Sequence, residues 1–150
     1  MKRTSSTPVL ILAVGVLLVA PALLANQGPC SFHSVSGTYA YTIAGNVLAG
    51  PAAGPTAGAG IITLNDDGTL AGSQTRSFNG SIADETTDGS FTVNDDCTGE
   101  FSINVYQNGV LVRTSLLHGV WDDGSSEIRG VFRTPFTAIN VTGRKRRGND

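Results

Sequence analysis

Beyond residue 35, short runs recur in which every second residue is apolar. One run spans residues 36–44 and another spans residues 100–106. Their apolar members fall on one face of an extended chain: Tyr39, Tyr41 and Ile43 in the first run, and Phe101, Ile103 and Val105 in the second. A period of two is typical of a strand that buries one face. Because no stretch of a dozen residues shows the 3.6-residue apolar period of an amphipathic helix, the pattern predicts an all-β fold.

Polar segments that contain Gly, Asn and Asp separate these runs and predict tight turns, since Asn-Gly and Asp-Gly supply positive φ. The expected turns are residues 65–68, 79–80, 88–89, 94–99, 107–109 and 122–125. The extended runs between them are residues 60–64, 69–78, 81–84, 90–93, 110–121, 127–134 and 136–141, besides the two named above. Sequential hairpins predict an antiparallel meander of seven or eight strands. A closed barrel is favoured over a sandwich because closure removes sheet edges.

One segment interrupts the alternation. Residues 49–60 consist almost entirely of Gly, Ala and Pro, a composition that disfavours regular structure. We expect a long mobile loop at one end of the domain, placed to act as a lid if the barrel holds a cavity.

The N-terminus has the pattern of a secretory signal. Lys2 and Arg3 precede an uncharged, largely aliphatic stretch over residues 8–24, and small residues follow Pro21. This pattern predicts a signal peptide over residues 1–25, cleaved after Ala25, and a secreted or periplasmic mature protein. The alternative is an uncleaved membrane anchor, because the apolar run approaches the roughly 18 residues that can span a bilayer.

Charge divides the rest of the chain. Residues 26–143 hold four arginines and no lysine against eleven acidic residues, whereas residues 144–147 are all basic and the whole chain carries a net charge of −2. An acidic body disfavours nucleic acid as a partner. The expected domains are therefore an N-terminal segment (26–35), one barrel domain (36–143) and a basic, disordered tail (144–150), which is either solvated or in contact with an anionic surface.

Two cysteines, Cys30 and Cys97, remain in the mature chain. In an exported protein we interpret them as one disulfide. The alternatives are a metal pair or a reactive thiol, but the chain has no Cys-x-x-Cys spacing and no histidine close to Cys97.

Candidate chemistry is sparse. Three acidic clusters (65–68, 94–96 and 121–124) offer oxygen ligands for calcium, but none has the spacing of a calcium loop, and each stands where a hairpin turn is expected. The histidines are His33 and His118, and no Gly-x-Ser-x-Gly elbow presents a nucleophile. We therefore predict no metal site, no cofactor and no identified catalytic residue.

Aromatic and aliphatic side chains suffice to line or to fill a barrel. An eight-stranded barrel is at the size where side chains close the core or leave room for one small ligand. The candidate cavity-lining residues are Tyr39, Tyr41, Phe101, Ile103, Trp121 and Phe132.

Three segments carry a family resemblance: residues 37–39, the hairpin 64–73, and residues 89–99, which contain Asn94-Asp95-Asp96-Cys97-Thr98-Gly99. Over residues 36–134 the chain resembles small secreted bacterial proteins with lipocalin-like or allene-oxide-cyclase-like barrels. The resemblance implies a barrel with room for a ligand, and it implies no catalytic residues.

The favoured hypothesis is a non-enzymatic exported barrel that binds a small apolar or amphipathic ligand, or acts as an extracellular interaction module. The first alternative is a barrel isomerase or cyclase that acts on a lipid-like substrate; it needs polar residues such as His118, Arg113 or Glu127 to point into a cavity. The second is a structural component of the envelope or matrix. The sequence leaves the oligomeric state open.

Overall fold

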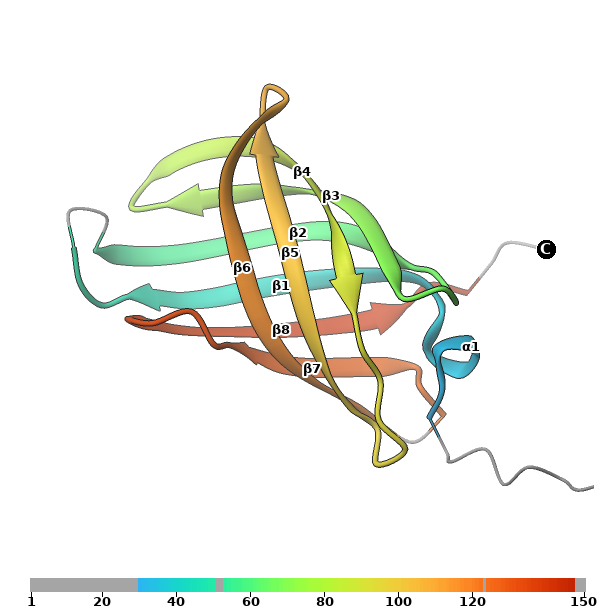
Figure 1. Ribbon diagram of the computed structural model, residues 1–150. Helices are drawn as coiled ribbons and strands as arrows, with labels where there is room; N and C mark the ends of the chain where they lie inside the picture. Colours follow the sequence, from blue (N-terminus) through green and yellow to red (C-terminus); the bar gives the residue numbers. More distant parts are fainter. Residues whose placement is uncertain (1–29, 51–52, 123, 148–150) are drawn as a thin grey trace, which may run out of the picture.

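The computed structural model describes residues 30–50, 53–122 and 124–147 (Figure 1). The predicted signal peptide and the last three residues of the predicted tail lie outside the described residues. The chain begins with a single helical turn, α1, and continues as eight strands. Their bounds are α1 Phe32–Val35, β1 Gly37–Val47, β2 Gly54–Leu64, β3 Thr69–Phe78, β4 Ser81–Phe91, β5 Thr98–Gln107, β6 Val110–Trp121, β7 Glu127–Phe132 and β8 Thr137–Lys145.

The eight strands form a closed antiparallel barrel in sequence order. Each strand pairs with the next, and β8 pairs with β1 to complete the circle. The closing ladder runs from Tyr39 opposite Lys145 to Val47 opposite Thr137. This arrangement confirms the predicted all-β meander and the preference for a barrel over a sandwich.

The prediction of a loop at residues 49–60 is wrong for most of the segment, because residues 54–60 belong to a strand. β2 starts at Gly54 and pairs with both β1 and β3, so the connection is limited to residues 48–53. The reason is the close approach of neighbouring strands: a Cβ atom on Gly60 would lie 2.3 Å from the carbonyl oxygen of Ser73. In this segment the small residues allow the strands to approach, which is a recognised use of Gly in a strand.

Two other boundaries differ from the expectation. Residues 81–91 form one strand, because Asp88-Gly89 continues the ladder opposite β3 and β5 and does not turn the chain. β8 extends through Arg144 to Lys145, two residues beyond the predicted end of the barrel. Lys145 also donates from Nζ to the carbonyl oxygen of Ser34 at 2.9 Å, so this part of the predicted tail is ordered.

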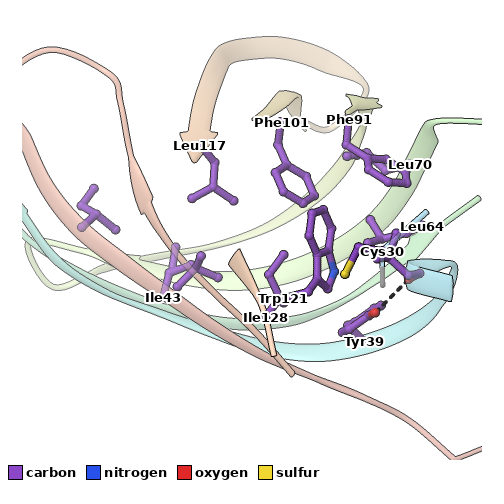
Figure 2. Packing of buried hydrophobic residues seen from close by; sticks show 13 residues of the cluster. Cys30, Tyr39, Ile43, Leu64, Leu70, Phe91, Phe101, Leu117, Trp121 and Ile128 are labelled. Carbon is purple, nitrogen blue, oxygen red and sulfur yellow. Dashed lines mark hydrogen bonds between the residues drawn. The ribbon is translucent and has the colours of Figure 1, made fainter. Parts of the chain in front are cut away.

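One end of the barrel is filled by side chains and covered by α1. Phe91 stacks on Phe101, with ring centroids 5.6 Å apart, and Phe101 lies 5.5 Å from the ring of Trp121. Phe32 of α1 meets the edge of Phe91. Figure 2 shows Phe91, Phe101 and Trp121 on the side of the core near the helix, where the Tyr39 hydroxyl donates to the carbonyl oxygen of Val35 at 2.8 Å. We call this region the packed end.

A disulfide joins Cys30 to Cys97 and ties the N-terminal segment to the packed end. It confirms the predicted pairing. Cys97 occupies the left-handed position of the β4–β5 turn, with φ of 64°, which corresponds to the place of Gly68 in the β2–β3 turn. The cross-link therefore ties the segment that precedes α1 to the β4–β5 turn and holds the helix over this end of the barrel.

The disulfide gives the first prediction. Reduction of the wild-type protein should lower the free energy of unfolding by about 4 kcal/mol, because the bond closes a loop with a sequence separation of 67 residues. Urea unfolding of the oxidised and reduced protein measures the difference. A Cys30→Ser/Cys97→Ser double variant is the control, since reductant should leave its midpoint unchanged. Equal midpoints for the oxidised and reduced wild type would contradict the prediction.

The close approach at β2 gives the second prediction. Gly60→Val should destabilise the protein by about 1–3 kcal/mol, because the new side chain must displace the backbone of β3. Ala59→Val is the matched control, since Ala59 is exposed on the neighbouring position of the same strand. Thermal unfolding measures both variants. If residues 54–64 form a paired strand, only Gly60→Val should lower the unfolding temperature; if they formed a loop, the two substitutions would have the same effect.

Candidate functional site

A cavity of about 290 Å³ lies inside the barrel beyond the packed end. Its wall is mostly apolar. The floor is formed by residues that also belong to the core, among them Leu64, Phe101 and Ile128. The volume is at the lower end of the range for small-molecule sites, about 300–1,000 Å³.

The mouth of the cavity is at the end opposite α1. The lining includes Val47 and Thr137, which pair at the end of the β1–β8 ladder farthest from α1, and Thr134 and Pro135 from the β7–β8 connection. Two large apolar side chains stand exposed beside it: Leu48 and Phe136, whose backbones are joined by a hydrogen bond of 2.7 Å. The mouth is therefore bordered by apolar surface.

A buried carboxylate lies beside the cavity on β4. The side chain of Glu85 has no exposed surface and forms a two-pronged ion pair with Arg113, whose Nη1 and Nη2 donate to its two oxygens at 2.8 and 2.6 Å. Arg76 donates to it from Nε at 3.1 Å. The amides of Gln74 and Gln107 complete the set. These five residues form what we call the Glu85 cluster.

The Glu85 cluster keeps its carboxylate ionised. Burial raises the pKa of Glu85, but hydrogen bonds from Arg113, Gln107 and Gln74 and the charge of Arg113 outweigh it and lower the pKa to about 2. Tyr41 donates from its hydroxyl to Oε1 of Gln74 at 2.9 Å. Burial, followed by the negative charge of Glu85, raises the pKa of Tyr41 to about 12. At neutral pH the carboxylate is therefore charged and the phenol keeps its proton.

Part of the Glu85 cluster faces the cavity, together with small polar residues. Gln74, Arg76 and Arg113 line the wall, as do the buried hydroxyls of Thr87 and Ser115. The hydroxyl oxygen of Thr87 has no hydrogen-bond partner among the described residues. Thus the largely apolar cavity has one side that carries its charged and amide groups, and this polar side is built on β3, β4 and β6.

The structure places five of the six candidate lining residues on the cavity wall: Tyr39, Tyr41, Phe101, Ile103 and Phe132. Trp121 differs. It is 2% exposed and packs against Phe91 and Phe101 in the packed end, away from the cavity. Aromatic residues therefore fill the barrel at the packed end and line a cavity at the other end.

The acidic clusters at 65–68 and 94–96 serve as turns with one shared design. Asp67 accepts hydrogen bonds from the backbone and hydroxyl of Thr69, and Asp96 does the same with Thr98. These bonds, from the hydroxyl first, lower the pKa of both carboxyls. Asp122 accepts likewise from the backbone of Ser126 and Glu127. In each turn one carboxylate oxygen is therefore engaged in local contacts, and the described residues contain no cluster suited to a metal ion.

Two of the three residues that an isomerase or cyclase would need in the cavity lie elsewhere. His118 contacts Oε1 of Glu100 through Nδ1 at 2.9 Å, and Glu127 pairs with Arg129. Neither belongs to the cavity wall, whereas Arg113 does. His33 is in α1, at the closed end.

Comparison of the chain with protein-family models, with curated proteins and with solved structures finds no match. The resemblance to small secreted lipocalin-like barrels thus stays a prediction. In the described part of the chain, no helix is long and apolar enough to cross a membrane.

The Glu85 cluster gives the third prediction. The folded-state pKa of about 2 lies below the ordinary value of 4.5, so the ionised carboxylate stabilises the fold above pH 4.5 and this contribution is lost as the pH falls toward 2. Glu85→Gln should cost about 3 kcal/mol at pH 7, the lower end of the range for a broken buried pair, because it leaves two partly buried guanidinium groups without their counter-charge. It should also flatten the dependence of stability on pH between 5 and 2.

Chemical unfolding at a series of pH values measures both effects. Glu100→Gln is the matched control: Glu100 also pairs with an arginine, Arg133, but on the surface. Its substitution should change stability little, as is usual for exposed pairs. If the two variants had the same stability at pH 7, the assigned role of Glu85 would be wrong.

Proposed function

We propose that this protein is an exported, non-enzymatic barrel that binds one small, largely apolar ligand in its interior cavity. The observation that carries the proposal is the division of the barrel interior. One end is filled with aromatic side chains, while the other is lined by small residues where larger ones would have closed the space. These are Thr56, Thr87, Ser115, Thr134 and Thr137.

The chemistry of the wall supports an apolar ligand. Aliphatic residues surround most of the space, including Ile43, Val105, Leu117 and Val141. Burying apolar surface contributes roughly 25 cal/mol per Å², so a short hydrocarbon chain would gain affinity here. The apolar border at Leu48 and Phe136 gives such a ligand a compatible path of entry.

Two features support action outside the cytoplasm. The Cys30–Cys97 disulfide is typical of oxidising compartments. The N-terminal pattern of two basic residues followed by an aliphatic stretch is typical of a secretory signal. Together they favour a secreted or periplasmic ligand carrier over a cytoplasmic one.

The fourth prediction tests the cavity with 1-octanol, an uncharged eight-carbon probe, by isothermal titration calorimetry. The wild-type protein should bind one equivalent. Ser115→Phe should weaken this binding at least tenfold, about 1.4 kcal/mol, because Ser115 is buried on the cavity wall and a phenyl group would occupy the space.

Val120→Phe is the matched control, since Val120 lies on the same strand and is exposed. It should bind octanol as the wild type does, and circular dichroism should show both variants folded. Absence of octanol binding by the wild type, or equal binding by both folded variants, would overturn the proposed function.

A further inference from the structure

The cavity has an unbalanced charge on its polar side. The Glu85 cluster contains one carboxylate and two guanidinium groups. Both arginines line the cavity, and among the residues that the structure describes no acidic side chain does. Since arginine stays protonated in proteins, the Glu85 cluster as a whole carries a net charge of one positive unit, and its positive groups are the ones that face the cavity.

The arginines also keep hydrogen-bond donors in reserve. A guanidinium group has five N–H donors. Arg76 uses one of them on Glu85 and Arg113 uses two. The side chain of Arg76 is 18% exposed and that of Arg113 30%, so each is largely shielded from bulk water. Donors in such surroundings bind an anion more strongly than the same donors on a surface.

Thr87 provides an independent indication. Its hydroxyl oxygen is buried on the cavity wall and has no partner among the described residues. Leaving a buried polar group unpaired destabilises the fold, so a ligand that pairs with it removes an existing penalty. Thr87 and Arg113 both pair with Val105, from opposite sides, so the two side chains belong to the same level of the barrel. The orphaned hydroxyl therefore stands at the level of the positive charge.

We propose that the cavity selects an amphipathic ligand with a carboxylate head, and that Arg76, Arg113 and Thr87 bind that head while the aliphatic wall holds the ligand's hydrocarbon body. This inference rests on the proposed function, because it assigns the head group of the same ligand. A monoanion balances the single excess positive charge. Its oxygens accept hydrogen bonds from the free guanidinium donors and from the Thr87 hydroxyl.

The fifth prediction compares three eight-carbon probes that differ only in the head group: octanoate, 1-octanol and octylammonium. At pH 7 and equal ionic strength, the wild-type protein should bind octanoate about tenfold more tightly than octanol, since hydrogen bonds to charged groups are roughly twice as strong as neutral ones. Octylammonium should bind less tightly than octanol, because its charge has the same sign as that of the arginines. Isothermal titration calorimetry measures all three.

Two variants test which residues are responsible. Thr87→Val removes the hydroxyl and keeps the shape of the side chain. Because this hydroxyl has no partner among the described residues, the variant should unfold at the same or a higher temperature than the wild type, yet lose severalfold in octanoate affinity. Thr142→Val, on the exposed side of β8, is the matched control and should leave binding unchanged. Arg76→Met should bring octanoate affinity down to that of octanol.

The outcomes separate the two proposals. Equal affinity for octanoate and octanol, or a preference for octylammonium, would overturn the carboxylate site and leave the apolar cavity in place. Failure of all three probes to bind would overturn the proposed function and this inference with it. If Arg76→Met does not fold, the head-group series on the wild type and the Thr87→Val comparison still decide the question.

Discussion

Closure of the barrel is the constraint on which the rest of the structure depends. The ladder between β1 and β8 joins the first strand to the last, so all strands are hydrogen-bonded on both sides. With eight strands the interior has a nearly fixed width, about that of the side chains that can fill it. The size of the inward-facing residues then decides whether each level is solid or hollow. Aromatic rings make the end near α1 solid, and threonine and serine leave the other end open.

The same constraint explains why a carboxylate can be buried so close to an apolar cavity. An isolated charge in such a place is costly, and it is tolerated when it is paired and hydrogen-bonded. The barrel brings β3, β5 and β6 around Glu85, so that donors reach it from three strands. The cluster also makes one side of the interior positively charged. Two arginines share the single carboxylate of Glu85, and among the described residues no second carboxylate balances the second arginine.

Much of the fold could be predicted from the sequence because its signals are local. The alternation around Tyr39, Tyr41 and Ile43 and the Asn-Gly turns indicate strands and hairpins without knowledge of distant contacts. Where prediction was wrong, a distant contact decided the outcome. From its neighbours in the sequence, Gly60 is typical of a loop, but it lies in a strand because the backbone of β3 packs against it. Asp88-Gly89 is typical of a turn, but it continues β4 because β5 pairs with it.

The candidate site was harder to predict for the same reason. Four of the lining residues, Tyr39, Tyr41, Phe101 and Ile103, follow from alternation. Phe132 and Trp121 were also expected on the cavity wall, but only Phe132 lies there. The Glu85 cluster was missed, although one signal was present. Glu85 stands two and six residues before Thr87 and Phe91, on the inward face of β4, and Arg113 likewise shares a face with Leu117 on β6. Opposite charges on the inward faces of two strands indicate a buried ion pair. The other residues that bind Glu85 cannot be identified in the same way, because they depend on the register of the strands.

The separation of the packed end from the cavity also bears on how such a protein can change. The disulfide, α1 and the aromatic rings that secure the fold lie at one end, and the residues that shape the cavity lie at the other. Substitutions at Thr56, Ser115 or Thr137 can alter the form of the cavity without disturbing the contacts around Trp121. A barrel divided in this way can acquire a different ligand through a few substitutions, each of which leaves the protein folded, and it is accordingly a practical scaffold for designed binding sites.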